Sequence, residues 1–224
     1  MSVMVAAMPL PPLLPEPSHS ANAEVDQHIV LRGMAWRDFE VMLALRGDRP
    51  GVRMYYLDGE IELMSPAKTH ESRKRCLARL LEVWALEGRV TISAFGSWTL
   101  KTELKEAGGE PDECYIVGPR DKDVPDLVIE IEWSRALGLA KQEIYRRLGV
   151  RELWTMNASG ELVIRVLQRD AWVVRAKSRI FPKLDLDELL SFVDVEPQGE
   201  AIHAYLDALR SKSLKPSRAP RRGR

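Results

Sequence analysis

The chain has 224 residues, of which 45% are hydrophobic, and its formal net charge at pH 7 is zero. This length suits one folded domain of about 150 to 190 residues with tails, and the hydrophobic content excludes a chain that is disordered throughout. A zero net charge excludes a global field that would draw the whole protein to nucleic acid or to a membrane. Any such attraction must come from a local patch.

Cysteine content and hydropathy indicate the cellular location that we expect for the protein. Cys76 and Cys114 lie far apart and form neither a CxxC motif nor a spacing typical of a zinc site. Such sparse thiols fit a reducing cytosol, so we expect a cytoplasmic protein. No apolar run in the sequence reaches the roughly 18 residues that a membrane-spanning helix needs, and we expect no membrane partner.

The two ends of the chain differ in composition from its centre. Residues 1–25 are interrupted by prolines and lack the basic residues that open a signal peptide, which predicts a disordered leader. Residues 211–224 contain six basic residues, two prolines and no acid. We therefore expect one folded domain over residues 26–197, followed over 198–224 by a helix remnant and a flexible basic tail. A solubilising tail and a phosphate-contacting tail both fit this composition.

Helix and hairpin patterns fill the first half of the domain. Residues 35–46 place apolar side chains close to helical spacing. Residues 54–64 surround an Asp-Gly turn, which is typical of a β-hairpin. Residues 69–88 are amphipathic and end at a glycine, which predicts a helix. The apolar stripe of this helix contains Cys76, Leu77, Leu80, Leu81, Val83 and Trp84.

Strand patterns dominate the second half. They occur at 90–95, 97–104, 112–118, 124–133, 151–157, 161–168 and 171–177. A helix is predicted from about residue 136 to 148, and a short one at 184–194. This mixed order predicts an α/β architecture in which helices flank one central mixed β-sheet.

The strand that begins at Val124 has an unusual distribution of charge. Leu127, Ile129, Ile131 and Trp133 share one face, whereas Asp126, Val128, Glu130 and Glu132 share the other. Three carboxylates on one face of a short strand repel one another unless a positive charge lies among them. The sequence therefore predicts a counter-charge at this face.

Two Pro-Asp pairs, each at the start of a predicted strand, supply candidate partners for these acids. Asp126 lies roughly 13 Å from Glu130 by strand rise, too far to share one small ion without a bend. Asp112 lies about 5 Å from Glu130 if their strands are neighbours. A hard divalent cation such as Mg²⁺ binds carboxylate oxygens of this kind and can activate a water molecule.

A lysine on the following helix is the candidate for charge stabilisation at the same site. Lys141 lies one turn before Tyr145, which we interpret as a core residue along with Trp84 and Trp154. The plainer interpretation also remains open. Arginines at 146, 147 and 151 can neutralise these acids as ordinary ion pairs.

Several of these motifs, taken in order, resemble a known family. The stretch DGEIELMSP is followed by a histidine, by two strand-opening Pro-Asp pairs, by PDLVIEI and by KQEIYRRLGVRELW. This order is similar to that of the Uma-two family of endonucleases, in the restriction-endonuclease-like PD-(D/E)XK superfamily. The resemblance runs from about Trp36 to Asp194. It implies a restriction-endonuclease-like fold with a central mixed β-sheet flanked by helices.

The resemblance also implies roles for particular residues. Asp112 and Glu130 would be metal-binding carboxylates with catalytic roles, and Lys141 would be the catalytic lysine, moved from the strand to the helix. Asp126 and Glu60 would be further members of the metal site. His70 would be an accessory residue at the start of the long helix, although a solvent contact near the helix start is the alternative.

The sequence departs from the superfamily pattern at Glu132. The motif places a lysine two residues after the metal-binding glutamate, and this chain has Glu132 there. Glu132 is therefore either an accessory ligand or the mark of an inactive site. The stretch WSRALG also replaces the Ser-Pro-Ser loop that often follows this strand in the family.

Two functions follow as expectations. The first is a metal-dependent endonuclease that hydrolyses DNA phosphodiester bonds with Mg²⁺ or Mn²⁺. The alternative is a catalytically inactive nuclease-fold module that binds nucleic acid or a protein partner. A homodimer is possible because cleavage of two strands needs two sites.

Deleting residues 211–224 tests whether the basic tail contacts DNA. If its cations neutralise phosphates, deletion weakens binding to duplex DNA and flattens the dependence of affinity on salt. Fluorescence anisotropy with a labelled duplex over a series of salt concentrations measures both quantities. An unchanged affinity and salt slope would identify the tail as a solubilising appendage.

Overall fold

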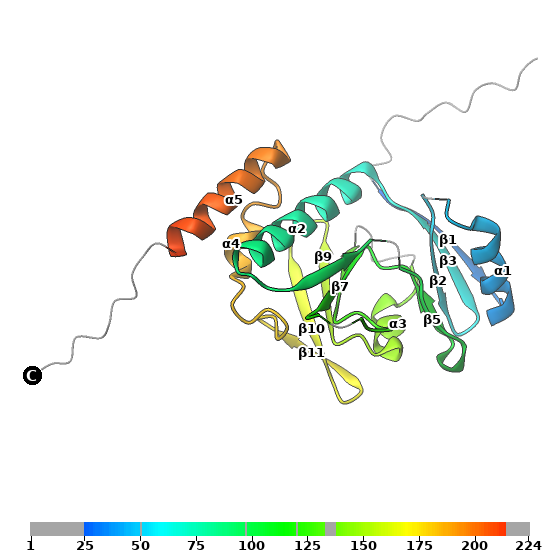
Figure 1. Cartoon of the computed structure of the whole chain (residues 1–224). Coiled ribbons are helices and arrows are strands. Elements are labelled where there is room, and N and C mark those ends of the chain that lie inside the picture. Colours follow the sequence, from blue (N-terminus) through cyan, green and yellow to red (C-terminus); the bar gives the residue numbers. More distant parts are fainter. Residues whose placement is uncertain (1–24, 50, 97, 120, 133–137, 214–224) are drawn as a thin grey trace, which may run out of the picture.

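The computed structural model places the strands in two sheets, with helices packed around and between them (Figure 1). The described residues are 25–49, 51–96, 98–119, 121–132 and 138–213. Apart from Val25, the predicted leader lies outside the described residues, as does the predicted tail beyond Ser213. The mixed α/β architecture is confirmed, although the strands divide between two sheets rather than forming one.

The first sheet is antiparallel and contains the predicted hairpin, with strand order β1-β3-β2-β6-β5. Its strands are β1 (Gln27–Arg32), β2 (Arg53–Leu57), β3 (Glu60–Ser65), β5 (Leu100–Thr102) and β6 (Ala107–Gly109). Helix α1 (Trp36–Arg46) packs on one face of this sheet. There Phe39 is fully buried, and its ring centroid lies 5.5 Å from that of Tyr56.

The second sheet is mixed and has strand order β11-β10-β9-β8-β7-β4. Its strands are β4 (Ile92–Phe95), β7 (Glu113–Val117), β8 (Leu127–Glu132), β9 (Glu152–Asn157), β10 (Leu162–Gln168) and β11 (Ala171–Arg175). Strands β8 and β9 are parallel, and the other pairs are antiparallel. A parallel pair needs a crossover, which helix α3 (Lys141–Leu148) supplies.

The remaining helices cover one face of the second sheet. The long helix α2 (Lys68–Glu87) runs across this face, and α5 (Gln198–Ser213) lies beside it (Figure 1). The short helix α4 (Leu186–Leu190) and a 3-10 turn at Glu103–Lys105 complete the described helices. None of the described helices is long and apolar enough to cross a membrane.

Strand β8 has the two faces that its sequence predicts. Leu127, Ile129 and Ile131 are buried in the core beneath α2. Val128 belongs to a second core on the opposite face, where it packs with residues of α3 such as Ile144. Trp133 lies outside the described residues. The acids of β8 therefore face the side of the sheet on which α3 lies.

Strands β1 and β6 were not predicted, and neither has a strong strand pattern. Strand β6 consists of Ala107, Gly108 and Gly109, a composition that sequence rules assign to a turn. Its lack of side chains has a packing reason, because an added Cβ at Gly108 would lie 2.7 Å from the Phe39 ring. Small residues are thus required where α1 and α3 approach the sheet.

Replacing Gly109 with alanine should destabilise the fold. A Cβ there would lie 2.8 Å from Cδ1 of Tyr55 and 3.4 Å from Cγ2 of Ile144. Such overpacking costs about 1–3 kcal/mol of unfolding free energy, which urea denaturation measures. Gly199→Ala is the matched control, since no heavy atom lies within 4 Å of its added Cβ. Equal effects of the two substitutions would contradict the packing argument.

Candidate active site

Asp112 and Glu130 lie opposite each other on neighbouring strands. The register of the antiparallel pair β7 and β8 places Glu113 against Ile129, so the preceding Asp112 is next to Glu130. Both side chains are fully buried. The expected adjacency of the two strands is therefore confirmed, and it places two buried carboxylates on neighbouring strands.

Asp112 is held by cationic and backbone donors. Its Oδ1 accepts a hydrogen bond from Nη1 of Arg53 and lies 3.0 Å from Nε2 of His70. Its Oδ2 accepts a hydrogen bond of 2.6 Å from the N–H of Ile131. Both carboxylate oxygens thus have partners, and the Arg53 guanidinium opposes the negative charge.

His70 connects Asp112 to a second buried acid. Its Nδ1 lies 2.8 Å from Oδ2 of Asp26, whose Oδ1 accepts a hydrogen bond from the N–H of Ala67. Burial alone would raise the pKa of Asp26, but the hydrogen bonds from His70 and Ala67 lower it below its ordinary value. His70 is therefore a fully buried link between Asp26 and Asp112 rather than a solvent-exposed residue at the helix start.

Glu130 has two partners on α3. Nζ of Lys141 lies 2.7 Å from its Oε2, and the hydroxyl of Tyr145 donates to its Oε1. The two donors are four residues apart on the helix, so they lie on one face and reach the same carboxylate. This ion pair is the predicted counter-charge for the acidic face of β8.

Lys141 is surrounded by groups that favour its charged form. Burial alone would lower the pKa of Lys141, but the charge of Glu130 and the neighbouring Tyr55 and Glu62 raise it above its usual range. Its ammonium also lies 4.2 Å from the centroid of the Tyr55 ring, a cation–π contact. Lys141 therefore remains protonated at neutral pH.

A further acid, Glu62, enters the site from β3. It is fully buried, and its Oε2 accepts a hydrogen bond of 2.7 Å from the N–H of Leu139, just before α3. Its Oε1 lies 2.6 Å from Nδ1 of His28 on β1. The sequence analysis did not single out Glu62 or His28. Glu62 has the signal of an acid flanked by apolar residues in a strand, Ile61 and Leu63.

The other predicted acids lie apart from this centre or at its edge. Asp126 is paired with Lys122 and lies 2.8 Å from Nη1 of Arg151. Glu60 bonds the exposed Arg32 at 2.9 Å. These contacts are ion pairs of the plainer kind. Glu132, by contrast, lines the same cavity as Lys141.

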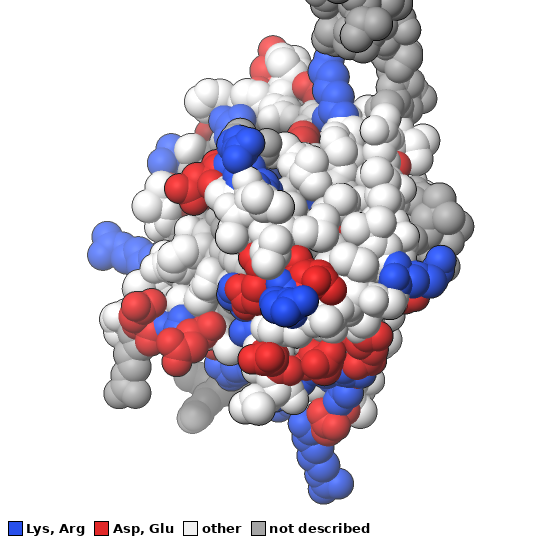
Figure 2. Space-filling model, turned by 90° about the vertical axis from the view of Figure 1, so that its right-hand side faces the viewer, with Lys and Arg blue, Asp and Glu red and all other residues white. Residues whose placement is uncertain are grey.

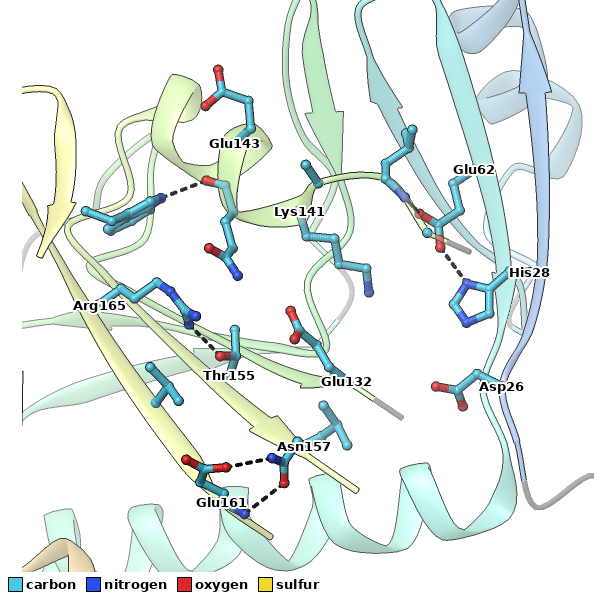
Figure 3. Close-up of a pocket in the computed structure, with 17 residues that line it drawn as sticks. Asp26, His28, Glu62, Glu132, Lys141, Glu143, Thr155, Asn157, Glu161 and Arg165 are labelled. Atoms are coloured by element: carbon cyan, nitrogen blue, oxygen red, sulfur yellow. Dashed lines mark hydrogen bonds and ion pairs between the residues drawn. The ribbon is translucent and has the colours of Figure 1, made fainter. Parts of the chain in front are cut away.

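The cavity lies between the two sheets and has a volume of about 770 Å³. Figure 3 shows the side chains of Glu132 and Lys141 pointing into it, with His28 and Glu62 on the wall formed by the first sheet. Thr155 and Arg165 line the opposite part, where Nη1 of Arg165 donates to the threonine hydroxyl at 2.6 Å. This volume can admit a nucleotide-sized group.

The types of ligand atom at this position suit a hard divalent cation. Asp112 and Glu130 offer buried carboxylate oxygens on adjacent strands, which are the ligands that Mg²⁺ prefers. Among the residues that the structure describes, however, no three His, Cys, Asp or Glu side chains form a group that could hold a metal ion. A cation at this position would have to displace a contact of Lys141 or Arg53 with these carboxylates.

A model of a known protein family matches most of the chain. The model of the Uma2 family, described as "Putative restriction endonuclease", matches residues 36–203. The chain belongs to the Uma2 family. The match and the mixed α/β architecture together confirm the restriction-endonuclease-like fold. Among curated proteins, none matches the chain.

The Uma2 match includes every site residue that the sequence analysis predicted. It begins at Trp36, so Asp26 and His28 precede it. Restriction-endonuclease-like families usually use divalent metals, which agrees with the carboxylate chemistry of Asp112 and Glu130.

Removing the partner of Glu130 should destabilise the fold strongly. Lys141→Met leaves a fully buried carboxylate without its cation, which costs about 3–5 kcal/mol of unfolding free energy in urea denaturation at neutral pH. The double variant Glu130→Gln/Lys141→Met removes both charges and should recover part of this loss. A direct ion pair would be contradicted if the loss of unfolding free energy in the double variant equalled the sum of the losses in Glu130→Gln and Lys141→Met.

Proposed function

We propose that the chain is a metal-dependent endonuclease that hydrolyses phosphodiester bonds in DNA, with Mg²⁺ or Mn²⁺ as cofactor. The observation that carries this proposal is the contact of Lys141, which lines the cavity, with Glu130, on the strand next to Asp112. The Uma2 match supports the same conclusion at the level of the family.

Asp112 and Glu130 would hold the cation. When bound, it would polarise the phosphodiester and lower the pKa of the attacking water. Lys141 stays protonated, so its role is to stabilise negative charge on the phosphate rather than to accept a proton. Tyr145 would orient Glu130 through its hydroxyl. Glu132 stands where the superfamily motif has a lysine, and Lys141 would supply that charge from α3.

The substrate must be attracted locally. Figure 2 shows the face on the α1 and β1 side, where acidic and basic side chains mix, in agreement with the zero net charge. The zero net charge supplies no long-range attraction of DNA, so local contacts, near the cavity or from the basic tail, must provide affinity. Arg165 and Lys141 are cationic residues that line the cavity and fit this role.

The location and assembly of the protein belong to the same proposal. Cys76 and Cys114 are free, buried thiols, which supports a cytoplasmic location. A homodimer would supply two sites for the cleavage of two strands.

The inactive module is the second candidate, and one observation favours it. Arg53 already pairs with Asp112 and Lys141 with Glu130, and no three-residue metal group occurs among the described residues. An inactive protein would keep these ion pairs as structural contacts and would bind no cation.

Cleavage assays with Mg²⁺ and Mn²⁺ on supercoiled, linear and single-stranded DNA separate the two candidates. We expect cleavage by the wild type and a loss of about 10²-fold or more in Asp112→Asn and Glu130→Gln, because each removes charge at the metal and phosphate. Glu60→Gln is the matched control, since its side chain pairs with exposed Arg32, and we expect it to keep wild-type activity.

Calorimetric titration of each metal is the companion measurement. A wild type that cuts no form of DNA and binds neither metal would overturn the nuclease proposal and establish the inactive module. Loss of activity in Glu60→Gln or Asp126→Asn equal to that in Glu130→Gln would instead extend the metal site to those acids.

A further inference from the structure

We propose that His28, held in place by Glu62, is a catalytic base for hydrolysis in the cavity. This inference rests on the proposed nuclease function and adds a residue that lies outside the Uma2 match. It follows from the position of His28, from the hydrogen bonds of Glu62 and from a ring nitrogen that has no hydrogen-bond partner among the described residues.

The first observation is that neighbouring groups hold His28 in a fixed position. His28 lies on β1 and Glu62 on the adjacent β3, in a register that pairs His28 with Met64 and Val30 with Glu62. Nδ1 of His28 lies 2.6 Å from Oε1 of Glu62. The other oxygen of Glu62 accepts the N–H of Leu139, so the carboxylate is fixed from two sides. A base oriented by a third group is the arrangement found in catalytic triads.

The second observation concerns the two ring nitrogens of His28. Burial alone would raise the pKa of Glu62, but the hydrogen bond from His28, the charge of Lys141 and the N–H of Leu139 lower it below its ordinary value. Glu62 is therefore ionised and can only accept hydrogen bonds. Nδ1 of His28 therefore donates to Glu62, and Nε2 is the ring nitrogen that remains available to a group in the cavity.

The third observation is the environment of Nε2. Nε2 of His28 is buried and has no hydrogen-bond partner in the part of the chain that the structure describes. The side chain is only 8% exposed, yet it lines the cavity that Lys141 and Glu132 also line (Figure 3). Buried polar nitrogens without partners are rare in folded proteins. A water molecule in this cavity can satisfy Nε2, and the same water is a candidate nucleophile.

The proposed reaction is hydrolysis of a phosphodiester bond. The oxygen of the water molecule attacks phosphorus, while Nε2 of His28 accepts a proton from that water. The bond between phosphorus and the leaving ester oxygen breaks, and its electron pair stays on that oxygen, which takes a proton from solvent. His28 then returns its proton to solvent. Protonated Lys141 opposes the negative charge that develops on the phosphate.

Charged side chains surround His28 on several sides. Glu62 on β3 and Asp26, just before β1, place negative charge beside the ring. Lys141 on α3 and Glu132 on β8 face it across the cavity.

The test compares histidine variants of the full chain in DNA cleavage with Mg²⁺ or Mn²⁺. His28→Gln should lower kcat by about 10²-fold or more with little change in KM. His28→Ala should recover activity when imidazole is added. Glu62→Gln should show a smaller loss of kcat. His203→Gln, at an exposed histidine of α5, is the matched control and should behave as the wild type.

A second readout is independent of cleavage. Nitrogen-15 NMR of the wild type should show His28 with its proton on Nδ1, and Glu62→Gln should alter that state. Should His28→Gln fail to fold, imidazole rescue of His28→Ala and the NMR state of Glu62→Gln still decide the matter.

The outcomes separate the two proposals. An active wild type whose kcat is unchanged in His28→Gln would overturn the role of His28 and leave the nuclease function standing. A wild type without activity on any DNA would overturn both, since His28 would then have no reaction to serve.

Discussion

The buried ion pair between Glu130 and Lys141 is the interaction on which the arrangement of the site depends. Glu130 is on the central strand pair of the second sheet, and Lys141 begins the helix that crosses from β8 to β9. A fully buried carboxylate is unstable without a cation, so the pair fixes where α3 starts. Tyr145 secures the same carboxylate from the next turn of the helix. The rest of the site is built against this fixed point.

Around this pair, the buried acids Asp112, Asp26 and Glu62 each have specific hydrogen-bond partners. Arg53 and His70 hold Asp112, His70 also binds Asp26, and the N–H of Leu139 reaches Glu62. These hydrogen bonds offset the cost of burying the carboxylates. The same balance bears on function, because a cation that binds Asp112 and Glu130 must compete with the cations already present.

Much of the fold and part of the site could be predicted from local sequence. The two faces of β8 follow from alternation, and the pairing of Asp112 with Glu130 follows from their strands being neighbours. The helical lysine follows from its spacing to Tyr145 and from the resemblance to the family. Strand β6 was missed because its glycines are selected by contacts with Phe39 and Tyr55, which lie far away in sequence. His28 and Glu62 were missed for a similar reason, since only the pairing of β1 with β3 brings them together.

The division of the strands between two sheets has a consequence for how the site comes into being. The hydrogen bond from Leu139 to Glu62 joins residues 77 positions apart, and that from His70 to Asp26 joins residues 44 apart. The chain enters the second sheet at β4, returns to the first at β5 and β6, and leaves it again at β7. No fragment of the described chain that contains the strands of only one sheet can therefore assemble the site. Such non-local closure favours slow, cooperative folding, in which the cavity forms only when both sheets are complete.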